Sequence, residues 1–108
     1  MVITADLLQE AGYCFTTILF FRAHWPEGMP VTIDNLLEAK RKGSIDFTKM
    51  VALAPRELQK RFWAAYGRLP PHSWESDPQR TAALYVRLAE AVEGPFPWPK
   101  DSGATVNR

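Results

Sequence analysis

The side chains in this sequence that most readily perform acid–base or nucleophilic chemistry near neutral pH are the thiol of Cys14 and the imidazoles of His24 and His72. A cysteine nucleophile needs a base to activate it, and only His24 folding back onto Cys14 would supply one. Neither histidine has a cysteine or a carboxylate pair at the spacing of a metal site. The aromatic neighbours Tyr13 and Phe15 predict that the cysteine is buried. We therefore expect no enzyme activity, no metal site and no cofactor.

The clearest charge pattern is a basic block in the middle of the chain. Residues 40–68 hold eight basic side chains against two acidic ones, whereas residues 1–39 and 69–108 are both net acidic. Such asymmetry is typical of a surface that meets an anion, although it does not identify that anion. The candidate partner-binding residues are the cations of the block and one tryptophan among them: Lys40, Arg41, Lys42, Lys49, Arg56, Lys60, Arg61, Trp63 and Arg68.

This block has three interpretations. In the first, residues 40–42 complement the negative end of a helix, and Lys60 and Arg61 form a solvated helix face that needs no partner. In the second, Lys49, Arg56 and their neighbours lie on two short helices and bind a nucleic-acid backbone. In the third, arginine and tryptophan together form a hot spot for an acidic protein partner. We favour a protein partner, with direct nucleic-acid binding as the alternative and homo-oligomerisation as another means of covering aromatic surface.

The elements that must position these residues are helices. Apolar residues recur at helical spacing, and no segment alternates with the period of a strand, which predicts an all-α, single compact domain of four to five short helices. Caps are expected at Thr4, Thr32 and Asp77, and Gly43 is expected just after a helix end. Gly12 interrupts or divides the first helix. The helices are predicted over about residues 5–23, 33–42, 55–66 and 78–93, with a loop at 69–76. A short helix that ends near Leu53 is predicted to start at Ser44 or Asp46.

A proline- and aromatic-rich segment follows the last predicted helix. Pro95, Pro97 and Pro99 alternate with Phe96 and Trp98, and such spacing holds the backbone extended. We expect this strap to fold back as a lid on the core, an arrangement we favour over an exposed binding motif. The domain is then predicted to span residues 1–99, with a flexible tail at 100–108.

The cellular setting is expected to be the cytoplasm. A single cysteine excludes an internal disulfide framework, which favours a reducing compartment. The longest apolar run is much shorter than a membrane-spanning helix, and the first residues lack the charged start of a signal peptide. We therefore expect no membrane association.

The first fifty residues carry a recurring pattern of structural motifs. A β-branched residue and a cap precede two leucines, then come a small-residue–cysteine step, an aromatic pair, a proline–glycine turn and a second capped helix. These motifs stand at residues 3–8, 12–14, 20–21, 25–28, 31–37 and 43–46. Tyr13 replaces the usual small residue, and the stretch after Cys14 is more aromatic than usual. In this pattern the N-terminal half resembles a short helical module of uncharacterised bacterial and phage or prophage proteins.

This resemblance implies a phage or prophage origin and no particular activity. Together with the basic block, it leads us to expect a small non-catalytic binding protein. One example would be a phage-encoded inhibitor that mimics or covers a nucleic-acid path on a host or defence nucleoprotein.

Overall fold

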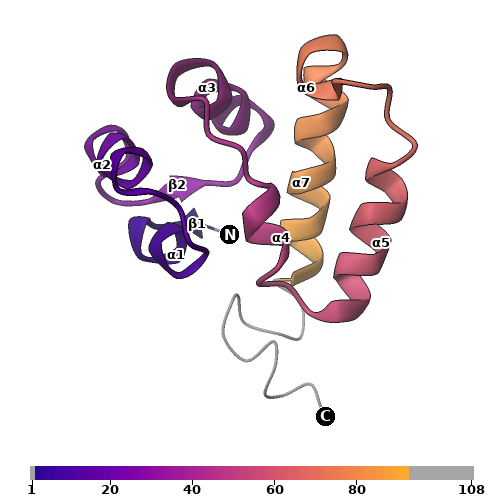
Figure 1. Cartoon of the computed structure of the whole chain (residues 1–108), viewed down its shortest axis with the longest axis horizontal. Coiled ribbons are helices and arrows are strands. Elements are labelled where there is room, and N and C mark those ends of the chain that lie inside the picture. The colour runs from indigo at the N-terminus through magenta and orange to yellow at the C-terminus, as the bar shows by residue number, and fades with distance from the viewer. Residues whose placement is uncertain (1, 93–108) are drawn as a thin grey trace.

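The structure is a computed structural model that describes residues 2–92 (Figure 1). The described part of the chain is mainly helical, which confirms the predicted class. The predicted strap at residues 95–99 and the tail at 100–108 lie outside the described residues. In chain order the elements are β1 (Val2–Ile3), α1 (Ala5–Glu10), α2 (Phe15–His24), β2 (Met29–Pro30), α3 (Ile33–Gly43), α4 (Thr48–Val51), α5 (Arg56–Tyr66), α6 (Ser73–Ser76) and α7 (Pro78–Val92).

Residues 2–92 contain seven helices where four to five were predicted. The first predicted helix is divided at Gly12, as the sequence predicts: Gly12 adopts φ +91° between α1 and α2. The helix that was not predicted is α6, a single turn in the segment predicted to be a loop. Four residues are too few to display helical periodicity, so the apolar pattern could not reveal it.

A pair of very short strands also departs from the prediction. β1 and β2 are antiparallel, and Val2 pairs with Pro30 while Ile3 pairs with Met29. Each strand has only two residues, which is too short for an alternating pattern to appear in the sequence. This pairing connects the start of the described chain to the segment that leads into α3.

Two helix starts form as the sequence predicts. The Thr4 hydroxyl accepts a hydrogen bond from the backbone N–H of Leu7 at 3.2 Å, and the Thr32 hydroxyl accepts one from Asn35 at 3.1 Å. Each bond satisfies an N–H group that has no partner inside its own helix.

The end of α3 differs from the prediction. Gly43 is the last residue of the helix and not the residue after it, and Ser44 takes a left-handed conformation at φ 52°. The Ser44 N–H donates to the Lys40 carbonyl and the Ile45 N–H to the Ala39 carbonyl, so the final turn is still closed.

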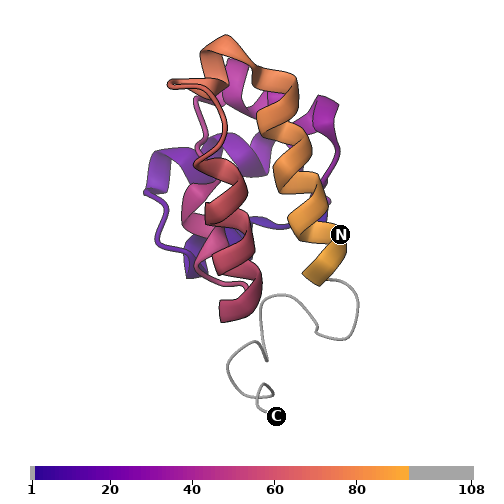
Figure 2. The ribbon, with the colours of Figure 1, turned by 90° about the vertical axis from the view of Figure 1, so that its right-hand side faces the viewer.

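α7 occupies a central position among the helices. It packs against α3, α5 and α6, while α1 packs on α2 and α2 packs on α3 (Figures 1 and 2). The largest fully buried side chains of the core include Phe21, Phe47, Leu36, Val51 and Val92. Within residues 2–92, no helix combines the length and the apolar run that crossing a membrane would require.

Candidate functional site

The predicted basic block does not form one surface. At the end of α3, Arg41 and Lys42 both contact Glu38, at 3.6 and 3.4 Å. The ammonium group of Lys40 lies 5.9 Å from the centre of the Trp74 ring. These three cations therefore interact with α3 itself and with α6, in addition to complementing the negative end of the α3 dipole.

Lys49 is also engaged within the fold. Its ammonium group donates a hydrogen bond to the Gly12 carbonyl at 3.3 Å and lies 5.3 Å from the centre of the Tyr13 ring. Lys49 thus connects α4 to the turn that follows α1.

The remaining predicted residues lie on or next to α5 and are exposed. Their spacing divides them between two sides of α5, because residues two apart do not face each other on a helix. Arg56, Lys60 and Trp63 share one side, which we call the α5 basic face, whereas Arg61 and Arg68 lie on the side that meets α7. Within residues 2–92, no carboxylate lies within 4.0 Å of a cation of this face. The sequence therefore predicted all of these residues, but it could not separate them from the four engaged cations.

Trp63 is the aromatic residue of the α5 basic face and is 42% exposed. Its ring meets Phe62 edge-on at a centroid distance of 5.0 Å and Tyr66 edge-on at 5.4 Å. Phe62 is buried in the core, so Trp63 is supported from behind by fixed aromatic neighbours. An aromatic side chain held in this way loses little conformational entropy when a partner covers it.

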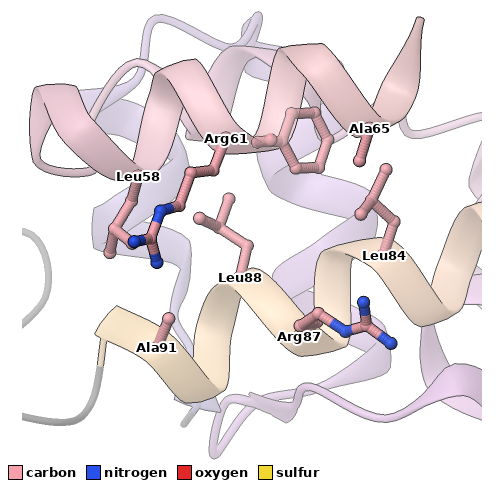
Figure 3. A pocket seen from close by; sticks show the side chains of 8 residues that line it. Leu58, Arg61, Ala65, Leu84, Arg87, Leu88 and Ala91 are labelled. Carbon is pink, nitrogen blue, oxygen red and sulfur yellow. The ribbon is translucent and has the colours of Figure 1, made fainter. Parts of the chain in front are cut away.

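A groove runs along the contact between α5 and α7, on the side of α5 that carries Arg61 (Figure 3). We call it the seam groove. One part has a volume of about 260 Å³, with a largely apolar floor and with Arg61 from α5 and Arg87 from α7 at its sides. The floor is formed by Leu58, Phe62, Ala65, Leu84, Leu88 and Ala91.

The seam groove continues toward the start of α7. A second part of about 280 Å³ shares Ala65, Leu84 and Arg87 with the first and adds Arg68 and Arg80. The Arg80 guanidinium group contacts the Asp77 carboxylate at 3.0 Å.

The predicted site residues do not include the two arginines that α7 contributes, Arg80 and Arg87. Arg80 and Arg87 are spaced seven residues apart, with Leu84 between them, and this spacing places all three along one side of a helix. This spacing is visible in the sequence. The predicted residues all belong to the basic block, however, and both arginines lie outside it.

Cys14, His24 and His72 lie in separate settings, and within residues 2–92 no hydrogen bond joins any two of them. His24 Nε2 lies 3.1 Å from Glu38 Oε2, and this contact is the main cause of a lowered Glu38 pKa. His72 adopts a left-handed conformation at φ 54°, directly before α6. Among residues 2–92, no group of three or more His, Cys, Asp or Glu side chains is arranged to hold a metal ion.

The prediction that Cys14 is buried is wrong. Cys14 is exposed at the start of α2, and Phe15 is 70% exposed, because both precede the part of α2 that faces the core. The hydroxyl groups of Thr16 and Thr17 lie 3.3 and 3.2 Å from the sulfur. Their hydrogen bonds lower the pKa of the thiol to about 6.

No protein-family model matches the chain, and no curated protein or solved structure matches it either. The predicted relation of residues 1–50 to a phage module therefore remains a prediction. The features of the described residues that bear on function are the α5 basic face and the seam groove.

Proposed function

We propose that this protein is a non-catalytic binding protein whose α5 basic face contacts an acidic surface on a protein partner. The observation that carries the proposal is the setting of Trp63, which is half exposed, held by fixed aromatic neighbours and on the same side of α5 as the exposed cations Arg56 and Lys60. Within α5 the one acidic residue is Glu57. Tryptophan and arginine are the residue types most enriched among interface hot spots.

Charge complementarity specifies the partner further. A basic face is attracted to Asp- and Glu-rich surfaces, and the attraction raises the association rate and excludes basic partners. The nucleic-acid path of a nucleoprotein is itself basic, so it would repel the α5 basic face. The target we propose is therefore an acidic surface of a partner, including one that lies beside such a path.

Direct nucleic-acid binding is a second candidate, and one observation favours it. Arg61 and Arg68 on the α5 side and Arg87 on α7 line the same groove, so guanidinium groups from two elements follow one line. A row of this kind can contact successive phosphates and release counterions, which makes binding strongly dependent on salt.

A photo-crosslinking experiment tests the protein contact. A photoreactive phenylalanine analogue at position 63 of the full chain is activated in cells, the captured protein is identified, and its affinity is measured with purified components. We expect the crosslinked surface to be acidic, and Arg56→Glu/Lys60→Glu to weaken the affinity roughly tenfold or more. The matched control is Arg22→Glu, an exposed cation on α2, which should bind as the unmodified chain does. Equal affinity for all three proteins would contradict the proposal.

A titration with labelled single- and double-stranded DNA tests the second candidate. Phosphate contacts predict affinity that falls steeply between about 50 and 200 mM salt. If this binding is lost in Lys60→Glu/Arg61→Glu and kept in Arg22→Glu, nucleic-acid binding becomes the favoured function in place of the protein contact. If DNA does not bind at low salt, the nucleic-acid candidate is rejected.

A further inference from the structure

The seam groove ends where the described part of α7 ends. Ala91, in the last turn of α7, lines the groove, and the helix is described to Val92. The residues that follow Val92 therefore start beside an apolar floor that contains the half-buried Leu58 and Leu84.

The composition of the following segment suits this groove. Phe96 and Trp98 alternate with three prolines. Proline has no backbone N–H, so covering this segment removes few hydrogen-bond donors from water. Aromatic side chains bury large apolar areas, and the guanidinium groups of Arg61 and Arg87 at the sides of the groove are suited to stack on their faces.

The dimensions also agree. From Ala91 back to Leu84, α7 rises about 10 Å at roughly 1.5 Å per residue. Five residues in a proline-rich extended conformation cover about 15 Å at roughly 3.1 Å each. Gly94 precedes them and permits the reversal of direction that this path requires. Each of the two parts of the groove, about 260 and 280 Å³, exceeds the roughly 150 Å³ cavity that accommodates one benzene molecule, so each has room for one aromatic ring.

We propose that residues 95–99 of the same chain occupy the seam groove, running back along α7 with Phe96 and Trp98 between Arg61 and Arg87. Residues 93–108 contain two acidic and two basic side chains, so net charge does not draw the segment to the arginines. Aromatic packing provides the attraction, and docking should therefore persist at high salt. This inference does not depend on the proposed protein contact.

Paramagnetic relaxation in the full chain tests the contact directly. A nitroxide is attached at Ser102→Cys in a Cys14→Ser background, and backbone amide signals of the ¹⁵N-labelled protein are compared before and after reduction of the label. We expect signal loss at Arg68, Ala83 and Leu84, because the docked segment carries residue 102 toward the start of α7. The amides of α2, which lies on the other side of the molecule, should be unaffected (Figure 1).

Two control samples make the result decisive. Replacing Phe96→Ser and Trp98→Ser, with the label in the same place, should restore the lost signals while the other amide signals stay unchanged. The proposal is overturned if no groove amide is affected in the starting protein, or if the loss persists without the two aromatic residues. The second control mixes ¹⁵N-labelled protein that has no nitroxide with unlabelled protein that carries the nitroxide. Loss of the same signals in this mixture also overturns the proposal, because the segment would then occupy the groove of another copy.

Discussion

The ring of Phe20 lies directly against Gly43, so α2 and α3 approach each other at a residue that has no side chain. A Cβ atom added to Gly43 would stand 2.7 Å from Phe20 Cδ2, closer than real Cβ atoms approach a neighbour. The Phe20 ring also stacks on His24, with centroids 5.3 Å apart, and His24 contacts Glu38 of α3. Moving the ring would therefore disturb a second contact between the same two helices.

We expect Gly43→Ala to lower the free energy of unfolding by about 1–3 kcal/mol, because overpacking outweighs the better helix propensity of alanine. Urea denaturation followed by circular dichroism measures the change. The control is Gly67→Ala, where the new Cβ would meet only ordinary contacts at 3.4 Å or more. Equal stability of Gly43→Ala and the unmodified protein would show that the ring moves without cost.

The thiol of Cys14 should be reactive at neutral pH. Hydrogen bonds from Thr16 and Thr17 lower its pKa to about 6, and a depressed pKa means that the thiolate is the main form above that pH. The rate of alkylation by iodoacetamide should rise with pH to a plateau, with its midpoint near this pKa. Thr16→Val/Thr17→Val should move the midpoint upward, and an unchanged midpoint would show that these hydroxyls do not stabilise the thiolate.

Stability should fall in alkaline solution. Burial, followed by the charge of Asp46, raises the pKa of Tyr13 and of Tyr85 well above the ordinary value of 10.0. A raised folded-state pKa gives stability that is complete below pH 10 and is lost as the pH rises further. Denaturation from about pH 9 to about pH 11 should show this loss, and Tyr13→Phe should reduce its slope. A flat profile would contradict the burial of these phenols.

The same two tyrosines should respond oppositely to loss of the hydroxyl group at neutral pH. The Tyr13 hydroxyl donates to the Asp46 carbonyl, so Tyr13→Phe should cost about 0.5–1.5 kcal/mol. The buried Tyr85 hydroxyl has no hydrogen-bond partner in the described part of the chain, so Tyr85→Phe should be neutral or stabilising. Thermal denaturation compares them, and a larger loss in Tyr85→Phe would reverse the assignment.

Lys49 should affect stability and leave partner binding unchanged. Its ammonium group contacts the Gly12 carbonyl and the Tyr13 ring, so Lys49→Ala should lower the free energy of unfolding by about 0.5–1 kcal/mol. Lys60→Ala removes an exposed cation of the α5 basic face, and it should weaken partner binding with little effect on stability. The opposite pattern would mean that the partner contacts the surface around α4.

The sequence indicated the helical class because helix starts are local. Thr4 and Thr32 each bond to a backbone group three residues away, and such a pattern is visible without knowledge of the fold. The pairing of Val2 with Pro30 and the contact between Phe20 and Gly43 join residues distant in sequence, so no local pattern could reveal them.

The candidate site was predicted in part for the same reason. A count of charges identified every cation of the α5 basic face, but it could not show that Lys49 is held by Gly12 and Tyr13. It also missed Arg87, because the neighbouring helix α7 follows the basic block in the chain.

The central position of α7 has a consequence for the order in which the protein is made. The helices that α7 covers, α3 and α5, are synthesised before it. Until α7 has left the ribosome, core residues such as Leu36 and Phe62 lack the neighbour that shields them from water. Nascent chains that stop before residue 78 should therefore be sensitive to proteases and should bind chaperones, and a compact domain should form only after α7 has emerged.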